Sequence, residues 1–214
     1  RGKAWGALGM GMATRQIRDR LSNRPTFQAA LSAAADGRFI PTPGGVLRFN
    51  NNAQLTMTNN AAGTYNASGF VFGSANTSAR TLGGNAVRFY DYSGNDPYIT
   101  NESSATHIIN LNIEGDGDAG DPLNINLNST GGLTFGGTLN NQGSAINVGG
   151  TTTSAATVTF NGILSGAGGL NKSNAYTTLV LGAANTFTGK TAITGGIVSI
   201  SADSGLGAAP GTAV

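Results

Sequence analysis

Two short segments that alternate apolar and polar residues constrain this chain most. They are Thr178–Gly182 (TLVLG) and Gly196–Ile200 (GIVSI), and the stretch between them is rich in Gly, Asn and Thr. Strict alternation is typical of a half-buried β-strand, and the intervening stretch is too interrupted by Gly and β-branched residues to form a helix. The residues that would share the inward face are Leu179, Leu181, Val198 and Ile200. A strand–turn–strand unit of this kind predicts one coil of a β-solenoid.

The same region resembles the passenger-associated β-strand repeat of autotransporter-type surface proteins. The matching positions are Leu170, Lys172, Leu179, Leu181, Gly182, Asn185, Thr186, Phe187, Thr188, Gly189, Thr191, Ile193, Gly196, Val198 and Ile200. There are two departures, a turn after Lys172 that is one residue longer and Lys190 in place of a second Gly, and both fall in expected turns. The clearest repeat covers residues 163–207. The resemblance implies a parallel β-helix at the outer surface of a bacterium, and it implies a scaffold more than a catalyst.

Composition agrees with an ordered, exported β-protein. Only 10% of the 214 residues are charged, 34 are Gly and 39% are hydrophobic, whereas a disordered chain combines low hydrophobicity with high charge. The chain has no cysteine, which excludes disulfides and thiolate metal sites and is compatible with export. No apolar run is long enough for a transmembrane helix. Because the sequence begins with Arg and stops within repeat-like sequence, we expect it to be part of a longer polypeptide.

The first 38 residues differ from the rest, and we treat 1–38 and 39–214 as separate domains. Residues 1–38 hold seven of the twelve Lys and Arg residues, so the segment carries a charge of +5 and the remainder −3. A short basic helix is predicted from Thr14 to Leu21. A second helix is predicted from an Asn23 cap to Gly37, with one apolar stripe formed by Phe27, Ala30, Leu31 and Ala34. A basic head suits nucleic acid or anionic lipid, but we favour a helical cap on the first coil and expect no nucleic-acid partner.

Apolar pairs recur along residues 39–214. The main set is Leu55/Met57, Phe70/Phe72, Val87/Phe89, Ile109/Leu111, Leu133/Phe135, Val158/Phe160, Leu179/Leu181 and Val198/Ile200, and a second set lies between its members at Leu123/Ile125/Leu127, Ile146/Val148, Ile163 or Leu170, and Ile193. An antiparallel sandwich or barrel would show the same alternation. Hairpin dipeptides are scarce, however, so the expected fold is all-β: a right-handed parallel β-helix with a short basic, partly helical N-terminal segment.

Candidate catalytic and metal-binding residues are few. His107 is the sole histidine and is expected at the surface of a strand edge. The acidic stretch from Glu114 to Asp121 offers Asp116, Asp118 and Asp121 as calcium ligands, since Ca²⁺ prefers six to eight oxygens. It lacks the glutamate that closes an EF-hand loop, so a solvated turn is the preferred interpretation. We therefore expect no metal, no cofactor and no enzyme activity.

Two alternatives to a plain scaffold remain. Asp91, Asp96 and Glu102, with Arg80 or Arg88 as a base, have the residue types of a β-helix polysaccharide lyase or hydrolase. The tyrosines Tyr65, Tyr90, Tyr92 and Tyr98 form a candidate binding surface for a glycan or a host surface, as in an adhesin. The preferred function is a non-catalytic extracellular structural solenoid, acting as a passenger or stalk segment.

The two ends of the chain suggest assembly. No charged or helical segment follows Ile200 to cover the last coil, and an open edge is a template for strand pairing. The head of one copy is expected to close the tail of the next, either by docking its N-terminal segment or by donating the strand Val46, Leu47, Arg48 and Phe49. The partner is thus another copy in a head-to-tail fibre, or further repeats of the same precursor.

Overall fold

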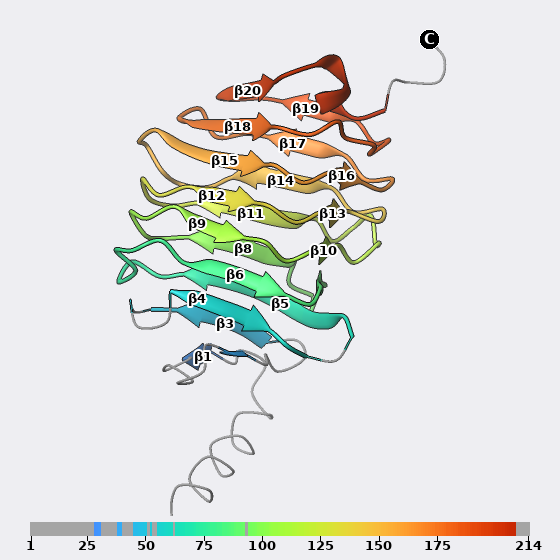
Figure 1. The fold of residues 1–214 in the computed structure, drawn as a ribbon. Helices are drawn as coiled ribbons and strands as arrows, with labels where there is room; N and C mark the ends of the chain where they lie inside the picture. Colours follow the sequence, from blue (N-terminus) through green and yellow to red (C-terminus); the bar gives the residue numbers. More distant parts are fainter. Residues whose placement is uncertain are drawn as a thin grey trace, which may run out of the picture.

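The strands of this protein run parallel and lie above one another in columns, as the computed structural model shows (Figure 1). The structure describes residues 28–30, 38–39, 45–50, 52, 55–61, 63–92 and 94–208, the first two ranges by their backbone alone. All the strand pairs among them are parallel. The fold is therefore all-β and a parallel β-solenoid, as the sequence predicts.

Three columns make up the three sides of the stack. Column one contains β1 (Gln28–Ala30), β3 (Gly45–Phe49), the second half of β5 (Tyr65–Phe72), β8 (Tyr98–Asn101), β11 (Leu123–Leu127), β14 (Ile146–Gly149), β17 (Leu170–Lys172) and β19 (Thr191–Ile193). Column two contains β2 (Arg38–Phe39), β4 (Thr56–Asn59), β6 (Thr81–Gly84), β9 (His107–Ile109), β12 (Leu133–Phe135), β15 (Ala156–Phe160), β18 (Thr177–Leu181) and β20 (Ile197–Ile200). Column three contains the first half of β5, β7 (Val87–Phe89), β10 (Ile113–Glu114), β13 (Leu139–Asn140) and β16 (Leu164–Ser165).

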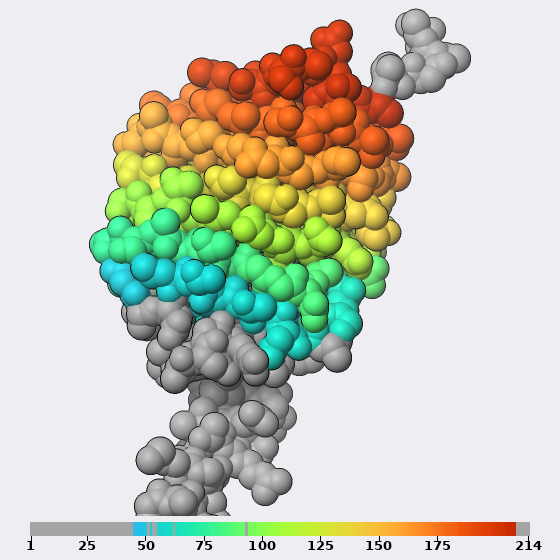
Figure 2. All heavy atoms as spheres, in the orientation of Figure 1, coloured from blue at the N-terminus to red at the C-terminus, as the bar shows by residue number. Residues whose placement is uncertain are grey.

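From β3 onward the chain visits the three columns in turn, so each circuit is one coil. Figure 2 shows successive coils as bands that follow the sequence from cyan to red. After β18 the third side carries no strand, but the amide of Thr186 still donates to the carbonyl of Leu164 one coil earlier, at 2.8 Å. The short 3-10 helix η1 (Asp203–Leu206) follows β20 on the same side, where the amide of Ala208 bonds to the Phe187 carbonyl.

Alternation within each strand sends every second side chain into the core. In β11, for example, Leu123, Ile125 and Leu127 are buried while Asn124 and Asn126 are half exposed. Because neighbouring strands pair in register, like side chains stack along the axis, as the rings of Phe135 and Phe160 do at 4.6 Å. Stacked aliphatic and aromatic columns therefore fill the interior between the three sides.

Turns in adjacent coils approach each other closely, and this explains much of the glycine content. Gly84 has a φ of 101°, and a Cβ there would collide with the Asn59 carbonyl in the coil below. Gly137 would meet the Leu111 carbonyl in the same way. Only glycine allows both the positive φ and the close contact at Gly84, and the close contact alone excludes a Cβ at Gly137.

The second predicted N-terminal helix is wrong over the residues that the structure describes. Gln28–Ala30, inside the segment expected to be helical, forms β1 and pairs with β3. The three-residue segment completes ladder hydrogen bonds with the exposed edge of β3, a tertiary gain that overrides helical periodicity. The helix expected from Thr14 to Leu21, and the rest of the second helix, lie outside the described residues.

Most residues of the predicted apolar pairs face the core, but the pairs do not all belong to one column. Phe70 and Phe72 belong to column one and Val87 and Phe89 to column three, whereas the later pairs belong to column two. The irregular early spacing follows from this mixture, since the column-two residue at that level is Leu82. Leu55 is 39% exposed and Ile163 44% exposed, so neither is a core residue.

Candidate functional site

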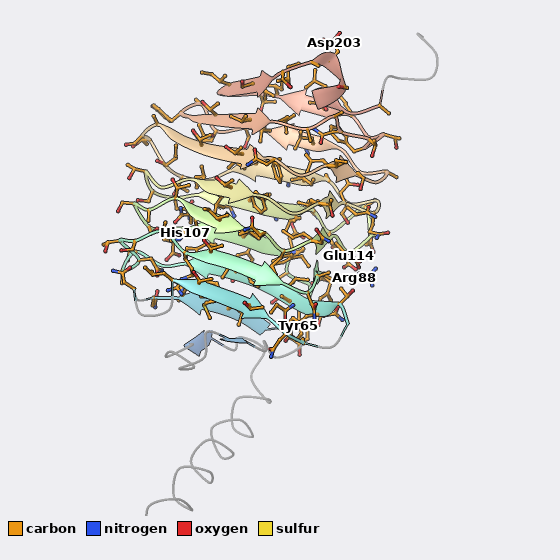
Figure 3. All side chains as sticks on the ribbon, in the orientation of Figure 1. Tyr65, Arg88, His107, Glu114 and Asp203 are labelled. Atoms are coloured by element: carbon orange, nitrogen blue, oxygen red, sulfur yellow. The ribbon has the colours of Figure 1, made fainter. Side chains whose placement is uncertain are left out.

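His107 lies in the core, which corrects its expected place at the surface (Figure 3). It begins β9, whose alternation directs residues 107 and 109 inward. Its ring is fully buried and stacks on the ring of Phe72 at 4.2 Å, with 11° between the planes. The stacking partner comes from the coil below, so no local sequence signal marks it.

The hydrogen bonds of His107 are opposite to those of a catalytic serine–histidine pair. Its Nδ1 accepts the backbone N–H of Arg80 at 3.1 Å, so the proton of the neutral ring is assigned to Nε2. Nε2 lies 2.7 Å from Ser103 Oγ and donates to it, and Ser103 lies 2.9 Å from Asn101 Oδ1, to which its hydroxyl donates. A general base must instead accept the serine proton. Burial, with the charge of Arg80, lowers the pKa of His107 to about 4, which keeps the ring neutral.

Arg80 is also an interior residue. Its guanidinium donates to Asn76 Oδ1 at 3.1 Å and to the Met57 sulfur at 3.2 Å. It lies 5.1 Å from the centre of the Phe49 ring, a cation–π distance. Burial lowers its pKa. With 2% exposure, this side chain is placed to hold the corner between columns one and two.

The structure does not bring the lyase-type residues together. Glu102 forms a two-pronged ion pair with Arg48, with a shortest N–O distance of 2.6 Å. Asp91 accepts the amide of Asn95 at 2.8 Å, and Asp96 accepts the side-chain amide of Asn124 at 3.3 Å. Arg88 Nε lies 3.9 Å from Glu114 Oε2. Figure 3 labels both residues on the same side of the stack. Each charged group thus has its own separate partner.

Two carboxylates of the acidic loop accept backbone amides, one from another coil and one from the loop itself. Asp116 accepts the amide of Asp91 at 3.1 Å, and Asp118 accepts the amide of Gly120 at 3.0 Å. Partial burial, followed by repulsion from Asp118 and the neighbouring aspartates, raises the pKa of Asp121. Within the ranges that the structure describes, no three His, Cys, Asp or Glu side chains are grouped so as to hold a metal ion.

The four tyrosines do not form one surface. Tyr65 points into the core of column three, where burial raises the pKa of its hydroxyl and leaves that hydroxyl without a hydrogen-bond partner. The ring of Tyr98 covers Gly69, since a Cβ at that glycine would lie 3.0 Å from it. Tyr90 and Tyr92 pack edge to face at 6.3 Å, and Tyr92 is 39% exposed. Tyr90 and Tyr98 are partly exposed, and Tyr92 is the most exposed of the four.

Lys172 is a buried residue that the sequence argument used only as a motif position. It ends β17 facing inward, is 1% exposed, and donates to the carbonyls of Asn174 at 2.5 Å and Gly195 at 3.1 Å. Burial lowers the pKa of its amine. The lysine therefore joins the turn of its own coil to the turn of the next one.

Asn185 has the same role on the third side. Its Oδ1 accepts the amide of Leu164 at 2.8 Å, and its Nδ2 donates to the carbonyl of Gly205 at 2.7 Å. It thus bonds to the coil before and to the coil after its own. Phe187, two positions later, is buried against the same turn. Lys172 and Asn185 are both positions of the repeat motif. The sequence does not show that they join coils, because this depends on which turns are stacked.

The expected donor strand is already paired on both sides. β3 pairs with β1 on one edge and with β5 on the other. Leu47 and Phe49 face the core, while Val46 and Arg48 face outward. Donation of Val46, Leu47, Arg48 and Phe49 to another copy would have to break one of these ladders, and this part of the assembly expectation stays a prediction.

Two isoleucines of the last described strands, β19 and β20, are exposed. Ile193 and Ile197 are 52% and 62% exposed, although Ile193 occupies an inward position. A separate hollow of about 570 Å³ is lined by residues that follow β18 and by residues of and after η1: Asn185, Thr186, Asp203, Ser204, Leu206, Gly207 and Ala208. Figure 3 labels Asp203 at this end.

The described residues define a parallel β-solenoid protein whose interior polar side chains join coil to coil. Comparison of the chain with protein-family models, with curated proteins and with solved structures found no match. In the part of the chain that the structure describes, no helix has the length and apolar character needed to cross a membrane.

Proposed function

We propose that this chain is a non-catalytic structural segment of a bacterial cell-surface or extracellular protein, of the passenger or stalk kind. The observation that carries the proposal is the use of the buried polar side chains: His107, Lys172 and Asn185 all bond across or within coil turns. Burying such groups costs free energy unless they are hydrogen-bonded, and here their hydrogen bonds hold turns of the solenoid together.

The repeat resemblance supports the same function. Lys172, Asn185 and Phe187 are among the positions that match the passenger-associated repeat, and each is buried in a coil contact. A motif whose matching residues hold coils together suits a scaffold that extends by repetition. The extracellular location is what the resemblance implies, and the lack of cysteine is compatible with export.

Two measurements test this proposal. The purified chain is incubated with a panel of pectins, alginates and other polysaccharides, and new reducing ends and unsaturated products are measured; we expect no turnover above a heat-denatured control. Turnover that is lost in the Glu102→Gln variant would overturn the non-catalytic assignment. Antibody labelling of intact cells of the source organism tests the location, and labelling seen only after lysis would contradict it.

A second function, glycan binding, is favoured by the exposed Tyr90–Tyr92 pair. Edge-to-face tyrosines on either side of Asp91 offer an apolar ring face next to a hydrogen-bond acceptor, a combination that suits a sugar. A glycan array with the unaltered chain and the Tyr92→Ala variant tests it. Tyr176→Ala is the matched control, since Tyr176 is 57% exposed and lies in a turn elsewhere in the stack. Binding that Tyr92→Ala leaves unchanged would exclude this site.

A further inference from the structure

Asparagine side chains on the outer face of column one form a hydrogen-bonded ladder along the stack. Asn124, Asn147 and Asn171 occupy paired register positions in β11, β14 and β17, which lie one above another (Figure 1). The Nδ2 of Asn171 donates to Asn147 Oδ1 at 2.8 Å, and the Nδ2 of Asn147 donates to Asn124 Oδ1 at 2.9 Å. Asn124 in turn donates to Asp96 Oδ2 at 3.3 Å. The ladder therefore holds its amides at the spacing of neighbouring strands, about 4.8 Å.

The ladder leaves hydrogen-bonding capacity for a ligand. A side-chain amide has two N–H donors and two oxygen lone pairs. Within the ladder Asn147 uses one of each, and Asn171 uses one donor. Asn147 is partly exposed and Asn171 is exposed. Both amides can therefore still bond to a ligand whose hydroxyl groups act as donors and acceptors.

The ring of Tyr98 continues the same line of positions. Tyr98 pairs in register with Asn124 on one side and with Gly69 on the other. A Cβ placed on Gly69 would lie 3.0–3.2 Å from Cε1, Cε2 and Cζ of the ring, which are its three nearest atoms. Because the hydroxyl is not among them, the ring lies with one face on the glycine, as an aromatic side chain can across neighbouring strands. The other face points away from the sheet, and the residue is partly exposed.

The charges on this face favour an uncharged partner. The outward positions of β8, β11, β14 and β17 hold no Lys or Arg. The Arg48 guanidinium beyond them is already paired with Glu102 at 2.6 Å. The carboxylate of Asp96, at one end of the ladder, would repel an acidic sugar. Electrostatic complementarity therefore excludes an anionic chain and suits a neutral one.

We propose that the line formed by Tyr98, Asn124, Asn147 and Asn171, here called the glycan strip, binds a neutral β-linked polysaccharide that lies along the stack axis. One sugar stacks on the outer face of the Tyr98 ring, and hydroxyls of the following sugars bond to the ladder amides. A sugar presents apolar C–H groups on its ring face and hydroxyls at its edge, so it matches an aromatic face with a few convergent amides. The strand spacing is close to the length of one sugar unit in an extended β-linked chain, so successive sugars meet successive coils.

The glycan strip is separate from the Tyr90–Tyr92 pair and adds a binding activity to the proposed surface segment. The two ideas fail separately, because a chain that binds no glycan would still be a non-catalytic scaffold. Calorimetric titration with oligosaccharides of increasing length from cellulose, xylan and mannan tests the strip. We expect at least one series to bind, with an affinity that rises from the disaccharide to the tetrasaccharide and then levels off, because the strip has four register positions.

Variants at the two ends of the glycan strip locate the contact. Tyr98→Leu keeps an apolar cover on Gly69 but removes the aromatic face, and Asn171→Ala removes the last amide. We expect each to weaken tetrasaccharide binding about threefold to tenfold, the range of one ring contact or one hydrogen bond. Tyr92→Leu and Asn161→Ala are the matched controls and should leave the affinity unchanged, since both residues are exposed and lie outside the strip. Circular dichroism melts establish that each variant is folded, and Asn171→Ala, at an exposed position, decides the test if Tyr98→Leu does not fold.

Weaker binding in both strip variants, with unchanged controls, supports the site. A weaker affinity in only one of two folded strip variants shows that the ligand does not lie along the axis and overturns the inference. It is also overturned if all three series fail to bind, if disaccharide and tetrasaccharide bind equally, or if polygalacturonate binds more tightly than the neutral chains. Binding that is lost in Tyr92→Leu but kept in Tyr98→Leu assigns the glycan to the Tyr90–Tyr92 pair instead.

Discussion

Burial keeps His107 neutral, and this makes the protein sensitive to acid. The pKa of the ring falls from 6.5 to about 4 on folding. Between these values the unfolded chain binds a proton that the folded chain does not, so stability is fully present above pH 6.5 and is lost as the pH falls through the window. The shift corresponds to roughly 3 kcal/mol of unfolding free energy.

We therefore expect His107→Gln to be less stable than the unaltered chain at pH 7 but to lose less stability between pH 7 and pH 4.5. The glutamine carbonyl can still accept a hydrogen bond, while the group no longer titrates. Urea unfolding at both pH values measures the difference. An unchanged loss in the variant would show that carboxylates, not His107, control the acid response.

Asn185 provides a second residue-scale prediction. Asn185→Ala leaves the Leu164 amide and the Gly205 carbonyl without their partner, which costs about 1–3 kcal/mol for each buried unsatisfied group. We expect a lower melting temperature and faster hydrogen exchange at the Leu164 amide. Asn161→Ala, at an exposed turn position, is the control and should change neither. Unchanged protection at Leu164 would contradict the bridging role.

Single residues were predicted less well from sequence than strands were. The apolar faces of Leu179 and Leu181 are evident from alternation, and both are buried. His107 was misplaced because its burial depends on Phe72, a ring in another coil. Lys172 is a basic residue, and only the stacked turn carbonyls that accept its hydrogen bonds explain why it lies inside. These partners are set by coil register, which local sequence does not contain.

At the scale of strands, the position of a residue along the stack axis determines how much a substitution lowers the free energy of unfolding. Leu181 of β18 is covered on both sides, whereas Ile200, its register partner in β20, is covered on one. We expect Leu181→Asp to cost more than the roughly 2–5 kcal/mol typical of Leu→Ala in a core, because it also buries a charge. Ile200→Asp should cost clearly less. Thermal unfolding of both variants checks the order, and equal losses would contradict the half-open position of β20.

The acidic loop supplies a prediction about calcium. Asp116 and Asp118 are already accepting backbone amides, so few of their oxygens are free to surround an ion. We expect calorimetry to show no micromolar Ca²⁺ affinity and no change in melting temperature on addition of EDTA. Micromolar binding that Asp118→Ala abolishes would reverse this conclusion.

Strands were predicted correctly where two apolar residues alternate with polar ones. A strand was missed where only one apolar residue is present. Leu133/Phe135, Val158/Phe160 and Leu179/Leu181 are genuine column-two pairs. Leu82 was missed because it is a single apolar residue between Thr81 and Gly83. The helical stripe through Ala30 was wrong because a free strand edge on β3 offered stronger pairing than a short isolated helix.

Across the whole molecule, stability should fall towards the C-terminal coil. Each coil is stabilised mainly by its immediate neighbours, and among the described residues β19 and β20 pair along one edge only. We expect amides of β12 and β15 to exchange slowly and those of β19 and β20 much faster. Hydrogen exchange followed by mass spectrometry of peptides gives the profile. A uniform profile would show that the stack unfolds as one cooperative unit.

The parallel columns also set the direction in which the molecule resists load. Ladder hydrogen bonds join one coil to the next, so they point along the stack axis, while the covalent chain winds around it. Tension applied to the two ends opens those bonds one rung after another, as a zipper opens. Tension applied across a coil must instead shear many bonds at once. A segment with this architecture would unfold in steps under tension along the stack axis and resist unfolding under force applied across it.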